Sequence, residues 1–206
     1  MKKNILIAFL AVCLLSVSVV SADIVDWNCD DDGDGAIVMD TPAWNYDSGS
    51  GEYTLSMAGT QYWAPAHVEG DFTTDTEEDP TVWIIETVDN QTTFDWTGYQ
   101  ILIGMTKNFT ISTSVIAPDD WVFEIIQPSV LGGGQEIPNG GTGWLGTIDY
   151  SVGTGSPIEI GQSGDFGFKI SFLGSVEFCT EQTPIPEPAT LALLGIGVLA
   201  SMRRRR

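Results

Sequence analysis

Apolar and polar side chains alternate through most of the chain between its two ends, and this two-residue period restricts the body to β-structure. The pattern is clearest over residues 166–172, where phenylalanine or isoleucine occupies every second position. Successive side chains of a strand point to opposite faces, so this period indicates strands with one buried face. The same pattern recurs in residues 53–57, 99–105, 109–115 and 121–125. No segment of useful length between the two ends has a helical period.

The turns between these segments favour a β-sandwich. About ten short strands alternate with turns rich in Gly, Pro and Asp at a spacing of roughly 8–12 residues, which is typical of jelly-roll or Ig-like sandwiches. Residues 82–85 are apolar on both faces and predict a central strand, and Gly174-Ser175 suits a tight turn into a C-terminal hairpin. Residues 132–143 hold six glycines and predict an irregular loop. We therefore predict one all-β domain over residues 23–182.

The N-terminus has the layout of a secretory signal peptide over residues 1–22. Lys2 and Lys3 precede an apolar run that extends to Val20, and Ser21 and Ala22 lead into an acidic stretch. A positive start, an apolar stretch and a small-residue cleavage site together define such a signal. We expect secretion signal peptidase to remove it, so that the body begins at Asp23.

The C-terminus has three parts in sequence: a Pro-rich segment over residues 183–188, an apolar run over 189–202 and four arginines at 203–206. As a helix the apolar run would be about 21 Å long at ~1.5 Å per residue. A bilayer core is about 30 Å thick, so this predicted transmembrane helix is short for a permanent span. Terminal arginines favour the cytoplasmic side, which leaves the body outside.

This tail resembles the PEP-CTERM sorting signal. Its motif Pro186-Glu187-Pro188 is followed by Ala189-Thr190, a short apolar helix and an arginine cluster, in the order of that family. The resemblance covers residues 183–206 and implies processing by a membrane exosortase in a bacterium that makes exopolysaccharide. It implies a membrane-tethered precursor that later reaches the cell surface or the extracellular matrix. It implies nothing about the chemistry of the body.

The charge of the body excludes some partners. Residues 23–182 contain 27 acidic and two basic side chains, a formal charge of −25. Phosphate backbones repel such a surface, so we exclude nucleic acid as a partner. An acidic surface instead attracts divalent cations and favours solubility.

Two cysteines remain in the body, Cys29 and Cys179. In an oxidising compartment, two cysteines are most simply paired, and we predict one disulfide that joins the first and last segments of the body. A zinc site is the competing interpretation. It is poorly supported because His67 is the only histidine and there is no CxxC spacing.

An acidic turn near the N-terminus of the body is the sharpest local motif. Its spacing matches the calcium-loop pattern D-x-D-x-D-G at Asp30, Asp32, Asp34 and Gly35, and Ala36 would supply a backbone carbonyl. The pattern then fails, because Thr41 stands where a bidentate glutamate belongs. Calcium is therefore a candidate cofactor, and a solvated acidic turn is the alternative. A second acidic run, residues 75–79, is interpreted as a solvated loop.

Aromatic side chains are the candidate ligand contacts. Trp83 and Trp121 lie inside apolar strand patterns and are expected in the core. Trp44 and Tyr46, which share one segment, and Trp144, which follows the Gly-rich loop, are better placed to stack against sugar rings. Burial of these rings in the core or against loops is the alternative.

No catalytic constellation stands out. His67 has no neighbouring motif, and no pair among 27 carboxylates can be singled out for glycoside hydrolysis. We therefore expect a non-enzymatic extracellular protein that associates with exopolysaccharide or biofilm matrix. A carbohydrate-binding module with a defined ligand is one alternative, and a glycan-active hydrolase is another.

Overall fold

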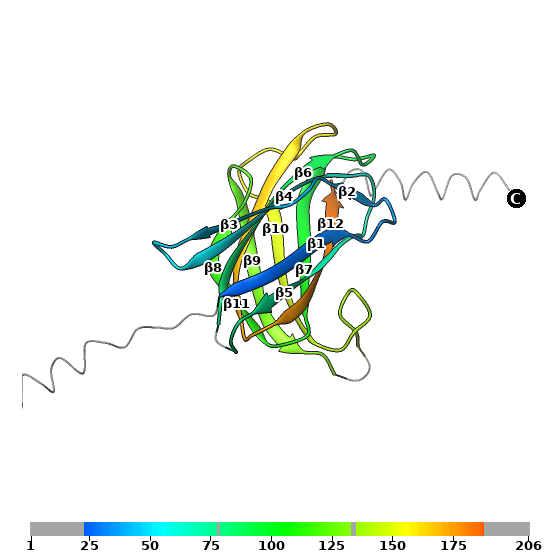
Figure 1. Ribbon diagram of the computed structural model, residues 1–206. Coiled ribbons are helices and arrows are strands. Elements are labelled where there is room, and N and C mark those ends of the chain that lie inside the picture. Colours follow the sequence, from blue (N-terminus) through cyan, green and yellow to red (C-terminus); the bar gives the residue numbers. More distant parts are fainter. Residues whose placement is uncertain (1–22, 78, 133–134, 188–206) are drawn as a thin grey trace, which may run out of the picture.

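The computed structural model describes residues 23–187, apart from residue 78 and residues 133–134. The described part consists of twelve strands without a helix (Figure 1). None of its elements is therefore a helix long and apolar enough to cross a membrane. The expected signal peptide (1–22), apolar helix (189–202) and arginine cluster (203–206) lie outside the described residues.

Twelve strands form two six-stranded sheets, which confirms the predicted β-sandwich. The first sheet contains, in spatial order, β1 (Ile24–Asp31), β5 (Ala66–Thr74), β12 (Val176–Pro186), β7 (Trp96–Met105), β10 (Trp144–Val152) and β9 (Trp121–Val130). The second contains β2 (Ile37–Met39), β4 (Glu52–Gln61), β6 (Thr81–Asn90), β11 (Ser163–Phe172) and β8 (Phe109–Ile116), with β3 (Ala43–Asp47) paired to β4.

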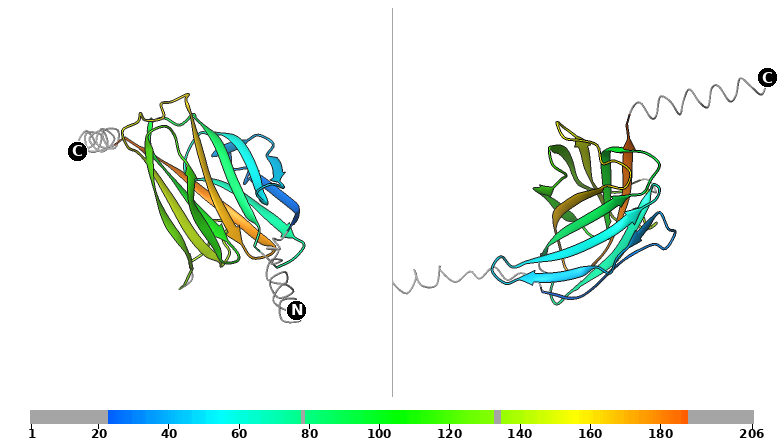
Figure 2. Two further views of the ribbon diagram at one scale, coloured as in Figure 1. Left: turned by 90° about the vertical axis from the view of Figure 1, so that its left-hand side faces the viewer. Right: turned by 90° about the horizontal axis from the view of Figure 1, so that it is seen from above.

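Nearly all the strand pairs are antiparallel, and the exception is the parallel pair of β4 and β6. β2 and β3 pair with different halves of β4, at Gly59–Gln61 and at Glu52–Ser56 respectively. The β3–β4 hairpin projects from one side of the sandwich (Figures 1 and 2).

The core lies between the two sheets, where most inward side chains are apolar and a small polar network surrounds Glu86. Aromatic rings fill its centre, with Phe166 stacked 4.3 Å from Tyr99 and edge-on to Trp121 and Tyr150. A second aromatic group surrounds Phe72 and joins the other end of the core. Rings at 4.5–7 Å gain packing energy beyond their buried area, so these contacts hold the sheets together.

The predicted strands agree closely with the structure. The alternating segments at 53–57, 99–105, 109–115, 121–125 and 166–172 lie in β4, β7, β8, β9 and β11. Residues 82–85 lie in β6, which is hydrogen-bonded on both sides. The glycine-rich residues described within 132–143 form a loop, and residues 174–175 form the β11–β12 turn.

The last strand extends four residues past the predicted boundary at Gln182, through the first part of the supposed linker. β5 pairs with β12 only as far as Gln182, whereas β7 pairs with it as far as Pro186. Beyond Gln182, one edge of β12 therefore has no partner strand. Proline lacks an N–H and is tolerated at such an edge, which explains how Pro184 and Pro186 fit in the sheet.

Cys29 and Cys179 do not form the predicted disulfide, because both are free thiols. Cys29 lies opposite Gly70 of β5, and Cys179 lies opposite the next residue, Glu69, so the two side chains point to opposite faces of the sheet. Their strands are separated by β5 and are about 10 Å apart, beyond the reach of a disulfide. Burial raises the pKa of Cys29 to about 12 and that of Cys179 to about 11, which keeps both thiols protonated.

Candidate functional site

The acidic turn between β1 and β2 is held by its own carboxylates. Asp31 is its anchor: its Oδ1 accepts a hydrogen bond from Gly33 N at 2.9 Å and its Oδ2 accepts one from Met39 N at 3.0 Å. Both oxygens of Asp31 are therefore used within the turn. Gly33 and Gly35 have φ values of 74° and 84°, in the region that favours glycine.

Asp32 and Asp34 each use one carboxylate oxygen inside the turn. The N–H of Asp34 donates to Asp32 Oδ1 at 3.1 Å, and the N–H of Ala36 donates to Asp34 Oδ1 at 2.6 Å. The backbone donor at Asp34, assisted by His67, lowers the pKa of Asp32 below its ordinary value. These carboxylates are therefore oriented by the backbone rather than free to rotate.

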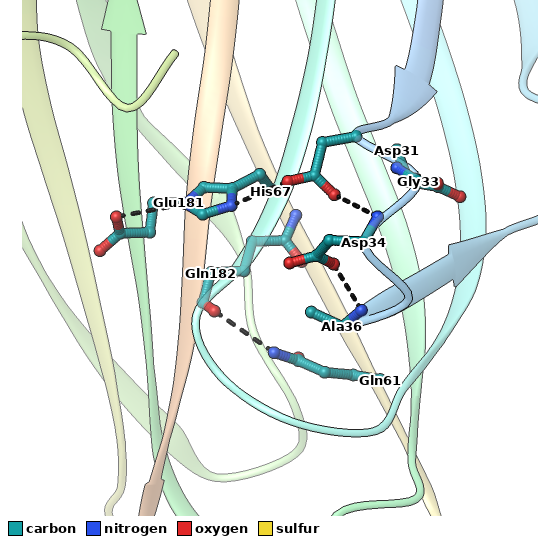
Figure 3. A network of polar contacts seen from close by, with 9 residues as sticks. Asp31, Gly33, Asp34, Ala36, Gln61, His67, Glu181 and Gln182 are labelled. Carbon is teal, nitrogen blue, oxygen red and sulfur yellow. Dashed lines mark hydrogen bonds and ion pairs between the residues drawn. The ribbon is translucent and has the colours of Figure 1, made fainter. Parts of the chain in front are cut away.

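His67 approaches this turn from β5. Its Nδ1 lies 3.2 Å from Asp32 Oδ2, and its Nε2 lies 3.4 Å from Glu181 Oε2 on β12. Figure 3 shows His67 between Glu181 on one side and the acidic turn on the other. One ligand atom from each of Asp32, Asp34 and His67 lies within 4.8 Å of the others. The three side chains thus form a cluster at the surface.

The structure brings two of the four predicted calcium ligands together in the cluster with His67. Asp32 and Asp34 lie together, but Asp30 lies on β1 opposite Glu69, outside the cluster. The Ala36 carbonyl accepts the N–H of Tyr62 at 2.8 Å and that of Trp63 at 3.4 Å, so it is already used by the β4–β5 turn. Calcium binding by Asp30, Asp32, Asp34 and Ala36 stays a prediction.

An aromatic turn lies directly beside the cluster. Tyr62 and Trp63 connect β4 to β5 and are 45% and 51% exposed. The Trp63 ring lies against Gly35, where an added Cβ would be 3.3 Å from the edge of the indole. Trp63 is the one tryptophan of the seven with an exposed side chain. We call Asp32, Asp34, Tyr62, Trp63, His67 and Glu181 the β4–β5 site.

Much of the β4–β5 site leaves no recognisable pattern in the sequence. From the sequence, His67 is a lone histidine without a neighbouring motif, and Trp63 is not distinguished from the other tryptophans. Antiparallel pairing of β1 with β5 brings His67 to the acidic turn, and this pairing leaves no local signal in the sequence. The adjacent aromatic residues Tyr62 and Trp63, shortly before Pro65, were the available local signal.

The predicted ligand contacts lie elsewhere. Trp44 is half-buried and stacks at 5.2 Å on both Trp27 and Tyr53, which leaves little free ring face. Tyr46 is 46% exposed on the projecting hairpin and packs against Tyr53. Trp144 is half-buried against the core at the start of β10. Ligand contact at Trp44, Tyr46 and Trp144 stays a prediction.

The surroundings of the β4–β5 site are strongly acidic. A depression of about 270 Å³ on the neighbouring outer face of the first sheet is lined by Asp30, Glu69, Asp71 and Glu177, among others. Of the second acidic run, Glu77 lies on another loop and pairs with Lys107 at 3.1 Å. Cations and hydrogen-bond donors are therefore attracted to the outer face of the first sheet beside the β4–β5 site.

A different carboxyl, Glu86, is enclosed within the core. Burial raises its pKa to about 7 although Gln182 Nε2 donates to its Oε2 at 2.7 Å. The other oxygen, Oε1, has no hydrogen-bond partner. The Tyr99 hydroxyl completes this internal network, with its single proton shared between Gln61 Oε1 at 2.9 Å and Gln182 Oε1 at 2.7 Å. A raised carboxyl pKa suits a general acid, but Glu86 is 3% exposed and out of reach of a substrate.

Comparison with known proteins gives one match, to the C-terminal tail. Residues 184–206 match the family model of the PEP-CTERM protein-sorting motif. Among curated proteins and among solved structures, nothing matches the chain. The body is thus described by its own geometry alone. The tail carries the PEP-CTERM sorting motif, which implies an exported protein whose membrane-anchored precursor is processed by an exosortase.

Proposed function

We propose that the exported domain is a non-enzymatic glycan-binding protein that associates with extracellular polysaccharide through Trp63. The observation that carries this proposal is the exposure of Trp63 beside fixed carboxylates. Tryptophan is usually mostly buried, and the other six of this chain are buried or half-buried. An exposed indole held in a turn is therefore a feature that folding of the core does not require.

Sugar recognition needs an apolar face and polar groups at its rim, and the β4–β5 site offers both. The C–H face of a pyranose packs on an aromatic ring, while its hydroxyl groups donate hydrogen bonds to oriented acceptors. Trp63 and Tyr62 supply the rings, at a centroid distance of 6.5 Å and an interplanar angle of 48°. Asp34 retains one carboxylate oxygen outside the hydrogen bonds of the turn backbone, whereas the second oxygen of Asp32 contacts His67.

The location of Glu86 also favours binding over hydrolysis. A glycosidase needs a carboxylic acid with a raised pKa beside the scissile bond. The carboxyl that has this property here, Glu86, lies between the two sheets. This buried location supports a structural role for Glu86 rather than a catalytic one.

Affinity electrophoresis tests the proposal. The exported protein is run through native gels that contain increasing concentrations of the host's exopolysaccharide. We expect saturable retardation of the wild-type protein and a loss of roughly five- to 150-fold in affinity for Trp63→Ala, since stacking on an aromatic contributes ~1–3 kcal/mol by analogy with bases. Trp63→Phe keeps a ring and should retain part of the affinity.

A matched control separates this site from the projecting hairpin. Tyr46→Ala removes a ring of similar exposure far along the sheet from Trp63, and we expect it to bind like the wild type. Retardation lost in Tyr46→Ala and kept in Trp63→Ala would place the glycan at the hairpin instead. Absence of retardation in the wild type would contradict glycan binding itself.

A further inference from the structure

We propose that Asp32, Asp34 and His67 bind a divalent first-row transition cation of the zinc type, with Glu181 orienting the imidazole. This inference does not depend on glycan binding. It differs from the calcium loop expected from the spacing of the turn, because it requires a residue of β5 and omits Asp30 and Ala36.

The separation of the ligand atoms fits such a cation. Zinc binds imidazole nitrogen at ~2.0–2.1 Å and carboxylate oxygen at ~2.0–2.2 Å. Two ligands of one tetrahedral ion are then roughly 3.3–3.5 Å apart. His67 Nδ1 and Asp32 Oδ2 are 3.2 Å apart, and the third ligand atom, from Asp34, lies within 4.8 Å of both. The three ligand atoms therefore lie close enough together to share one cation.

The second nitrogen of His67 supplies an independent argument. Metal-bound histidines usually donate their other N–H to a carboxylate, which fixes the tautomer and orients the ring. Glu181 Oε2 lies 3.4 Å from His67 Nε2 and occupies this position. With the proton on Nε2, the lone pair of Nδ1 points to Asp32. A cation bound between Nδ1 and Asp32 Oδ2 would take the place of the proton that links these two atoms when both ring nitrogens are protonated.

The donor set selects the class of metal. Imidazole suits zinc, copper, nickel and iron, whereas calcium takes six to eight oxygen ligands. Three protein ligands leave coordination positions open to water, because the side chains of His67 and Asp32 are 28% and 29% exposed. The surrounding acidic face adds favourable charge for any cation. Selectivity for the transition metal therefore depends on His67.

Metal titration of the exported protein, prepared without a histidine tag, tests the inference. After treatment with chelator, the melting temperature is measured against added Zn²⁺ or Ca²⁺. Wild-type protein and Asp30→Asn should be stabilised by Zn²⁺, and His67→Gln should require at least tenfold more Zn²⁺ for the same shift. Excess Ca²⁺ should not reproduce the effect. Binding of Co²⁺ should give a visible absorption band that His67→Gln lacks.

Each other outcome overturns the inference in a recognisable way. An equal Zn²⁺ shift in wild type and His67→Gln would indicate unspecific binding to the acidic face. A shift produced by Ca²⁺ and lost in Asp30→Asn would restore the calcium loop. If His67→Gln changes the melting temperature even in the presence of chelator, His67 has a role in folding. The Co²⁺ spectrum then decides whether His67 is also a metal ligand. A Co²⁺ band that persists in His67→Gln would exclude His67 as a ligand.

Discussion

Replacing Glu86 by glutamine should stabilise the protein in a pH-dependent way. Burial raises the pKa of Glu86 from 4.5 to about 7, so the folded chain holds this proton more tightly than the unfolded chain. Between these two values the folded state binds more protons, and its stability therefore falls as the pH rises. Above about pH 7 the full cost of burying the charged carboxylate is present, and below pH 4.5 this cost disappears.

The magnitude follows from the two pKa values. A gap from 4.5 to about 7 corresponds to about 3 kcal/mol at ~1.4 kcal/mol per pKa unit. No buried cation offsets this penalty, because the two lysines of the body pair with Glu77 and Glu52 instead. The titratable groups around Glu86 are the phenols of Tyr99 and Tyr150 and the thiol of Cys29, whose pKa values are all raised.

Glutamine keeps the shape of the protonated acid and can still accept the hydrogen bond from Gln182. We therefore expect Glu86→Gln to raise the free energy of unfolding by about 3 kcal/mol at pH 8 and by almost nothing at pH 4. Urea denaturation across this pH range measures the difference. Glu124→Gln, on the exposed face of β9, is the control for simple loss of charge. A variant that is equally affected at both pH values, or destabilised at pH 8, would refute the reasoning.

Two further predictions concern the first sheet. Gly70→Ala should destabilise the fold by about 2–3 kcal/mol in urea denaturation, because its Cβ would overlap the Asn28 carbonyl oxygen. Gly132→Ala is the control and should be nearly neutral in the same assay, because nothing lies within 4 Å of its new Cβ. The thiols of Cys29 and Cys179 should react with a thiol reagent only after unfolding, and a reductant should leave the melting temperature of the exported protein unchanged. A reductant-dependent melting temperature would show that a disulfide forms after all.

The sequence predicted the fold class well because the signal for a half-buried strand is local. The alternation at residues 166–172 required no knowledge of the partner strands, and it identifies β11. The end of the last strand could not be predicted in this way. Pro184 and Pro186 argue against a strand unless one edge is known to lack a partner, and that depends on where β5 stops pairing.

The site was predicted only where its residues are close in the chain. The Asp-Gly spacing placed Asp32 and Asp34 in a turn, and the structure confirms the turn. His67 reaches them through strand pairing, which a single sequence does not reveal. The disulfide prediction was wrong for a related reason. It rested on the presence of two cysteines in an oxidising compartment, whereas their distance depends on the strand order, in which β5 lies between β1 and β12.

Binding without turnover is the central claim, and one equilibrium experiment tests both halves of it. The exported protein is titrated with purified host exopolysaccharide, and bound polysaccharide and newly formed reducing ends are measured in the same samples over time. We predict saturable binding that depends on Trp63 and a constant number of reducing ends. An increase in reducing ends with time, or the absence of saturable binding, would contradict the account.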